Sequence, residues 1–65
     1  MVNAEKQRKV YGERLRAKRL AHGLTQQQLA DKVGSSRVSV NKWEQGVSTP
    51  MKIYQERMNR MLGKV

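Results

Sequence analysis

Two short segments in the middle of the chain carry apolar residues at helical intervals. In residues 26–33 and residues 37–45 these are Leu29, Ala30, Val33, Val40 and Trp43. A spacing of three or four residues places such side chains on one face of an α-helix. Gly34 lies between the segments, and glycine commonly ends a helix because it adopts a left-handed conformation without steric cost. The pattern therefore predicts two helices joined by a tight turn.

Polar residues at the ends of these segments support the same helix boundaries. Thr25 stands where an N-cap is expected, and Gln28 three residues later completes a capping box. Ser36 can cap the helix over residues 37–45, and Gly46 follows its last residue. Start and stop signals thus agree with the apolar spacing.

A helix is predicted on each side of this pair. The preceding one is clearest over residues 13–22, where Leu15, Ala17, Arg19 and Leu20 alternate with outward basic residues, and His22 and Gly23 form its end. The following one is predicted to be capped by Ser48 or Thr49, with Pro50 in its first turn. Its apolar stripe comprises Met51, Tyr54, Met58 and either Met61 or Leu62. No strand pattern is present, so the sequence predicts a compact all-α fold of four helices, or five.

Residues 1–10 admit two interpretations. They carry Lys6, Arg8 and Lys9 and few apolar anchors, and Gly12 weakens a helix that runs through this region. Either a basic arm precedes a helix that starts near Tyr11, or residues 1–10 extend that helix from near Asn3. We prefer the arm. Its basic side chains would contact phosphate, enter the minor groove or only raise solubility. Residues 11–65 form the predicted domain.

The composition excludes several classes of protein. A chain of 65 residues forms one small domain, and it contains no cysteine for a disulfide or a thiolate metal site. One histidine and five acidic residues give little material for catalysis or for binding a metal, so we expect neither an enzyme nor a cofactor. No apolar run approaches the roughly 20 residues that span a bilayer, and no signal-peptide h-region is present. We expect a cytoplasmic protein.

The charge points to a polyanionic partner. Fourteen Lys and Arg residues against five Asp and Glu residues give a net charge of +9. An excess of positive charge of this size indicates which partners a protein binds, and does not indicate its fold. Nucleic acid is the first candidate and an anionic membrane surface the second, although a membrane peptide would need one amphipathic basic helix rather than several capped ones.

The outward face of the helix over residues 37–45 has the chemistry of a base-reading surface. With Val40 facing inward, Val38, Asn41, Lys42 and Gln45 fall on the far side, and Arg37 projects from the first turn. Arg or Lys can donate to guanine O6 and N7, Asn or Gln can pair with adenine N6 and N7, and valine can pack on a thymine methyl group. We therefore expect base contacts from Arg37, Val38, Asn41 and Lys42. The alternative is a solvated polar face.

Phosphate contacts are expected around this face. Amide and hydroxyl groups at the beginnings of the two central helices and in the loop after them can donate to phosphate oxygens. The candidates are Gln26, Ser36, Ser39, Gln45, Ser48, Thr49 and Lys52. Capping, turn formation and ordinary surface polarity are the alternative roles for these residues.

From about Tyr11 to Pro50 the chain resembles the phage repressor and Cro type of helix-turn-helix domain, the Xre family. The residues that carry the resemblance are RLRAKRLAHGLTQQQLADKVGSSRVSVNKWEQG, with small Ala30, turn Gly34 and the spaced apolar residues Leu29, Val33, Val40 and Trp43. The resemblance implies a lambda-repressor-like DNA-binding fold with its motif at residues 26–45. It also implies that Arg37, Val38 and Lys42 read bases beside Asn41, that Gln26 binds a phosphate, and that Arg19 pairs with Glu44.

These features together predict a transcriptional regulator that binds double-stranded DNA. The expected form is a Cro-like or autoregulatory repressor from a phage or mobile element. It would act as a homodimer on a palindromic operator, with no membrane association and no small-molecule effector. The alternative is an antitoxin-like or other protein-interaction module whose DNA binding is secondary, with the methionine stripe near the end of the chain as its contact surface.

Overall fold

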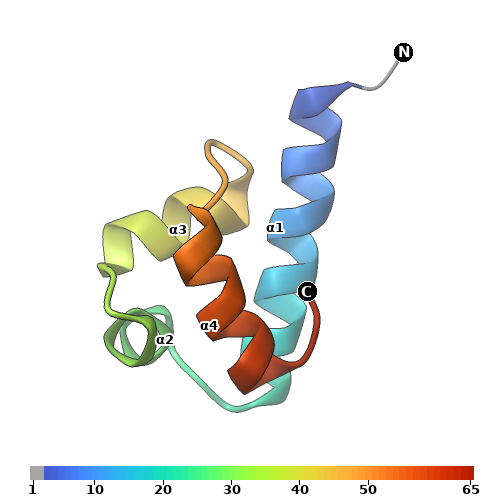
Figure 1. The fold of residues 1–65 in the computed structure, drawn as a ribbon. Coiled ribbons are helices and arrows are strands. Elements are labelled where there is room, and N and C mark those ends of the chain that lie inside the picture. The colour runs from blue at the N-terminus through green and yellow to red at the C-terminus, as the bar shows by residue number, and fades with distance from the viewer. Residues whose placement is uncertain (1–2) are drawn as a thin grey trace.

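The computed structural model describes residues 3–65 and contains four helices in that range (Figure 1). They are α1 (Ala4–Ala21), α2 (Gln26–Val33), α3 (Arg37–Gln45) and α4 (Lys52–Leu62). Residues 3–65 contain no strand, and the predicted all-α, lambda-repressor-like fold is confirmed. Within the same residues, no helix is long and apolar enough to cross a membrane.

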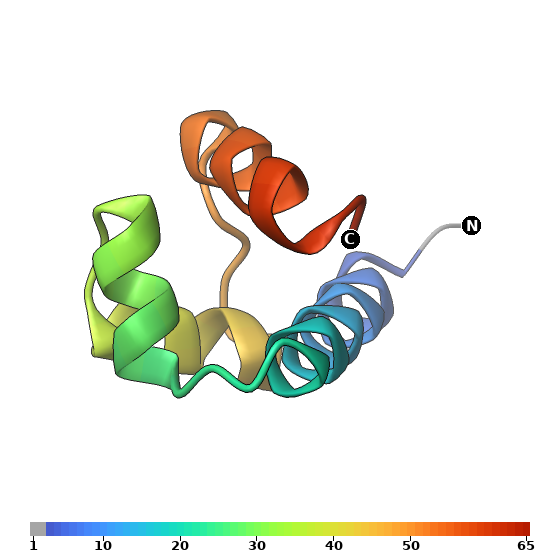
Figure 2. The same ribbon diagram turned by 90° about the horizontal axis from the view of Figure 1, so that it is seen from below.

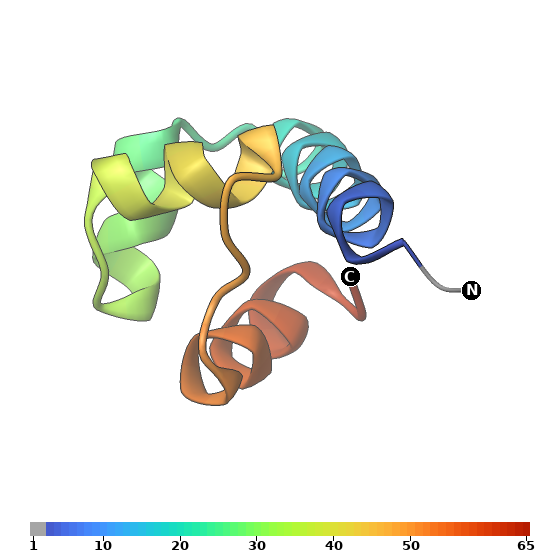
Figure 3. The same ribbon diagram turned by 90° about the horizontal axis from the view of Figure 1, so that it is seen from above.

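The helices surround a single small core. α1, α2 and α3 form an open arc, and α4 lies across its concave side (Figures 2 and 3). All four helices contribute buried apolar side chains, which are Leu15, Leu29, Ala30, Val33, Val40, Trp43, Met58 and Leu62. The rings of Trp43 and Tyr54 pack with their centroids 5.6 Å apart, which joins α3 to α4. α3 therefore has its inner face fixed by the core, and its outer face lies on the outside of the arc.

The predicted capping and turn residues between the two central helices are confirmed. The backbone N–H of Gln28 donates to Thr25 Oγ1 at 3.0 Å, and the backbone N–H of Thr25 donates to Gln28 Oε1 at 2.8 Å. Ser36 Oγ accepts from the backbone N–H of Ser39 at 3.2 Å. Gly34 has a φ of 76°, a left-handed conformation that favours glycine, and this turn sets the angle between α2 and α3.

The preferred interpretation of the first ten residues is wrong for those that the structure describes. α1 begins at Ala4, where Asn3 Oδ1 accepts from the backbone N–H of Lys6, and it continues without a break through Gly12. Residues 4–10 thus extend the helix instead of forming an arm; Met1 and Val2 lie outside the described residues. Tertiary contact explains the continuity, because Gly12 lies against the end of α3 and Arg8 Nε donates to the carbonyl oxygen of Gly46 at 3.4 Å.

The predicted start of the last helix is also wrong. α4 begins at Lys52 with Met51 as its N-cap residue, so neither Ser48 nor Thr49 caps it and Pro50 precedes it. Instead, Gln55 Nε2 donates to the Pro50 carbonyl oxygen at 2.8 Å, which ties the first turn of α4 to the loop. Pro50 is buried in this loop, and the helix starts two residues after it.

Three apolar residues that the sequence pattern assigns to inward helix faces lie at the surface. Met51, which the pattern places in the stripe of the last helix, is 65% exposed, and Leu20 and Ala17 of α1 are exposed as well. Met58 and Leu62 are buried as the stripe predicted. The later start of α4 accounts for Met51, because this residue precedes the helix that would have turned it inward.

The hydroxyl oxygen of Tyr11 is buried, and none of the described residues forms a hydrogen bond with it. Burial raises the pKa of this hydroxyl above its ordinary value of 10.0. The unfolded chain therefore loses the Tyr11 proton at a lower pH than the folded one. As a result, the stability of the fold falls as the pH rises above 10.0, and is unaffected by this group at lower pH.

We expect Tyr11→Phe to preserve or raise stability, by up to about 1 kcal/mol, because it removes a buried hydroxyl that makes no hydrogen bond. Urea unfolding at pH 8 and at pH values above 10 would measure this. The variant should also lose less stability than the original chain over the alkaline range. A loss of more than about 1 kcal/mol at pH 8 would show that the hydroxyl has a stabilising partner.

Candidate nucleic-acid interface

The outward face of α3 presents the side chains that the sequence predicts for base contacts. Arg37, Val38 and Lys42 are exposed, and Val38 is 60% exposed although it is apolar. Asn41 is half-buried between them. Val40 and Trp43 are buried on the opposite face, so the orientation of the helix is fixed by the core. The structure thus leaves this face open to a partner; base contact itself stays a prediction.

A shallow hollow joins this face to the beginning of α2. Its lining residues are Gln26 of α2 and Arg37, Val38 and Asn41 of α3. The turn at Gly34 brings these residues together although eleven positions separate Gln26 from Arg37. The hollow combines a guanidinium group, two amides and an exposed valine, and can therefore contact both polar and methyl groups of a partner.

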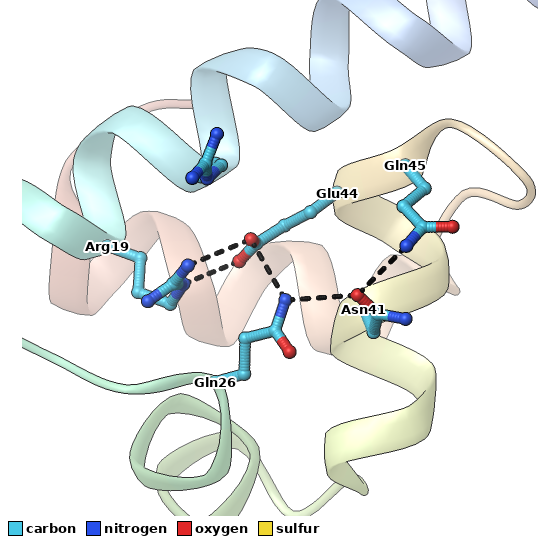
Figure 4. A pocket seen from close by; sticks show the side chains of 6 residues that line it. Arg19, Gln26, Asn41, Glu44 and Gln45 are labelled. Atoms are coloured by element: carbon cyan, nitrogen blue, oxygen red, sulfur yellow. Dashed lines mark hydrogen bonds and ion pairs between the residues drawn. The ribbon is translucent and has the colours of Figure 1, made fainter.

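Arg19 and Glu44 form the ion pair that the resemblance implies. Arg19 Nε donates to Glu44 Oε2 at 2.6 Å, and Arg19 Nη2 donates to Glu44 Oε1 at 3.0 Å (Figure 4). The side chains are only 8% and 3% exposed, and Arg19 Nη1 also donates to the Leu24 carbonyl oxygen at 2.7 Å. This bidentate pair holds α1 against α3 and also binds the loop before α2.

The ion pair continues into a chain of side-chain amides. Gln26 Nε2 donates to Glu44 Oε1 at 3.2 Å and to Asn41 Oδ1 at 3.3 Å. Gln45 Nε2 donates to the same Asn41 Oδ1 at 3.2 Å. Figure 4 shows the side chains of Gln26, Asn41 and Gln45 converging from α2 and α3 beside the buried pair. The amide nitrogen of Gln26 is therefore engaged within the protein, and its predicted phosphate contact stays a prediction.

A second hollow lies beside this network and contains a residue that sequence analysis did not select. Its lining combines Arg16, Gln45 and the members of the network, namely Arg19, Gln26, Asn41 and Glu44. Arg16 precedes Arg19 by three positions, so both fall on neighbouring positions of α1. The sequence pattern places Arg16 among the outward residues of α1, and its side chain is exposed. Its spacing of three residues from Arg19 is the signal that could have linked it to this hollow.

The other candidate phosphate contacts occupy two places. Ser36 caps α3 and its hydroxyl donates to Ser39 Oγ at 3.1 Å, which leaves the Ser39 hydroxyl hydrogen available to a partner. Ser48 is half-buried in the loop after α3, and Thr49 and Lys52 are exposed there. The structure therefore provides donors at both ends of α3.

Comparison with known proteins gives one family. The family model HTH_3, described as helix-turn-helix, matches residues 15–63, which is 49 of the 65 residues. The match includes α2, α3, α4 and the last part of α1, residues 15–21. No curated protein matches the chain.

Proposed function

The chain belongs to the Xre-type helix-turn-helix family HTH_3, a family of DNA-binding transcription regulators, and from this premise we propose that it is a Cro-like or autoregulatory repressor of a phage or mobile element. In this proposal α3 enters the major groove of operator DNA. The observation that carries it is the outer face of α3, where Arg37, Val38 and Lys42 are exposed beside Asn41. Repression would follow from occupancy of a promoter, without catalysis.

The proposed complex is a homodimer on a palindromic operator. Helix-turn-helix dimers place their two reading helices in successive turns of the major groove, so the half-site centres should lie about 34 Å apart. Selection of bound duplexes from a random library would test this directly. A consensus of two inverted half-sites supports the dimer, whereas a single asymmetric site contradicts it.

A reporter promoter that overlaps the selected site should lose transcription when the protein is present, and increased transcription would exclude repression.

The structure supports the interaction-module alternative less than the sequence does. The alternative uses the methionine stripe near the end of the chain as its contact surface, but Met58 in this stripe is fully buried in the core. Met51 is exposed, together with Val47 and Ile53. A tight protein partner that purifies with the chain and competes with DNA would favour this alternative.

We expect Arg37→Ala to relax the base preference at one position of the operator and to weaken binding to the best site by about 1–3 kcal/mol. The reason is that an exposed guanidinium in the first turn of α3 can donate to guanine O6 and N7. Affinities for the best duplex and for its single-base variants would measure the effect. Arg60→Ala is a suitable control, because it removes the same charge from an exposed position of α4. An equal loss of affinity for all duplexes would assign Arg37 to phosphate instead.

A further inference from the structure

The network beside the buried ion pair determines which end of each amide group faces its neighbour. Glu44 carries a carboxylate, which only accepts hydrogen bonds. Glu44 Oε1 already accepts from Arg19 Nη2, and Gln26 lies 3.2 Å from the same oxygen. Gln26 must therefore direct its NH2 group, and not its carbonyl oxygen, toward Glu44. The orientation of the first amide follows from the charge of the pair.

The orientation of the second amide follows from that of the first. The NH2 group of Gln26 also lies 3.3 Å from Asn41, so Asn41 must direct an acceptor toward it, and this acceptor is Oδ1. Gln45 contributes a second donor to Asn41 Oδ1 at 3.2 Å. A side-chain carbonyl oxygen accepts through two lone pairs. Both lone pairs of Asn41 Oδ1 are therefore used inside the protein.

Asn41 consequently has only a donor left for a partner. Its NH2 group makes neither of the two bonds to Gln26 and Gln45, and Asn41 lines both hollows at the α2–α3 junction. Asparagine pairs with adenine through both ends of its amide, because Oδ1 must accept from adenine N6 while Nδ2 donates to N7. With Oδ1 occupied, the adenine pairing that the sequence alone favours is no longer the best match.

We propose that Gln26 is a positioning residue that fixes Asn41 as a donor, so that Asn41 selects a guanine rather than an adenine in the major groove. Guanine presents two acceptors there, O6 and N7, whereas adenine presents a donor beside its one acceptor. The buried Arg19–Glu44 pair thereby sets a base preference through Gln26 without contacting DNA itself. This inference rests on the proposed function, because it requires that the outer face of α3 reads bases.

The test compares duplex selections for the original chain and for three variants. Asn41→Ala identifies the base pair that Asn41 reads, as the position whose preference disappears. At that position the original chain should prefer guanine to adenine by at least about fivefold. Gln26→Met keeps the length of the side chain but removes its NH2 group, so the ratio of guanine to adenine affinity should fall to about one. Gln27→Met is the matched control, because Gln27 Nε2 bonds Asp31 within α2 at 2.8 Å and does not touch Asn41.

Each outcome separates this inference from the proposed function. If the original chain shows no base preference at all, the proposed function fails. If it has a consensus but prefers adenine at the Asn41 position, or if Gln26→Met lowers affinity for all duplexes with an unchanged ratio, the positioning role is wrong. Should Gln26→Met fail to fold, Gln45→Met releases the other lone pair of Asn41 from an exposed site and should lower the same ratio in the same direction.

Discussion

Glu44→Leu should destabilise the fold by about 3–5 kcal/mol, because it leaves the Arg19 guanidinium buried without its counter-charge. The two side chains are 8% and 3% exposed, and the pair is bidentate. Folded proteins have a total stability of only about 5–15 kcal/mol, and a 65-residue domain is at the low end of the range. Thermal and urea unfolding followed by circular dichroism should therefore show a variant that keeps no more than about 2 kcal/mol of stability and is partly unfolded at 25 °C.

A double-mutant cycle separates the pair from its surroundings. Combined with Glu44→Leu, Arg19→Met should recover part of the loss, because the second change removes the uncompensated charge. The exposed pair Lys9–Glu5 provides the control, with a separation of 3.5 Å and side chains that are 59% and 65% exposed. Glu5→Ala should cost at most about 0.5 kcal/mol. If Glu44→Leu costs no more than Glu5→Ala, the buried pair does not hold α1 to α3.

Local sequence signals predicted the centre of this fold well. Thr25, Gln28, Gly34 and Ser36 each perform the capping or turn role that their chemistry indicates. Such roles depend on atoms within four residues, so they can be identified in a sequence. The apolar spacing of Val40 and Trp43 likewise fixed which face of α3 is buried, and therefore which face is open to DNA.

The errors arose where tertiary contacts override local preference. A glycine in a helix costs about 1 kcal/mol relative to alanine, which favoured a helix start after Gly12. The structure continues the helix because that glycine permits contact between α1 and α3, and no local pattern contains that information. The start of α4 was misplaced for a similar reason, since buried Pro50 belongs to the loop rather than to the first turn.

In the candidate site, the sequence predicts which residues are present but not how their amide groups are oriented. Helical geometry predicted that Asn41 faces outward from α3, but the bonds to its oxygen come from Gln26 on another helix and from Gln45 one turn later. A sequence gives the amide but not its rotation, since the rotation depends on the polarity of groups that only the fold brings together. The sequence alone favours adenine at this position, whereas the orientation of the Asn41 amide in the fold favours guanine.

Gly12→Ala should destabilise the protein, although helix propensity alone predicts a gain of about 1 kcal/mol. A Cβ atom at this position would overlap the carbonyl oxygen of Trp43 and lie 2.6 Å from that of Glu44. Both are backbone atoms at the end of α3, so a change of side-chain rotamer cannot relieve the overlap and the two helices must separate. We expect a net loss at or above the upper end of the roughly 1–3 kcal/mol that overpacking costs.

Gly23→Ala is the matched control for this substitution. Gly23 has a φ of 68°, and a Cβ atom there meets no other atom within 4 Å, so the cost should be only the roughly 1–2 kcal/mol of a left-handed alanine. Unfolding in urea measures both variants against the original chain. Separation of α1 from α3 also lengthens the Arg19–Glu44 bonds, so Gly12→Ala should lose duplex affinity at temperatures where it is still folded, whereas Gly23→Ala should not. A Gly12→Ala variant as stable as the original would mean that α1 and α3 do not approach each other this closely, and the buried ion pair would lose its geometric basis.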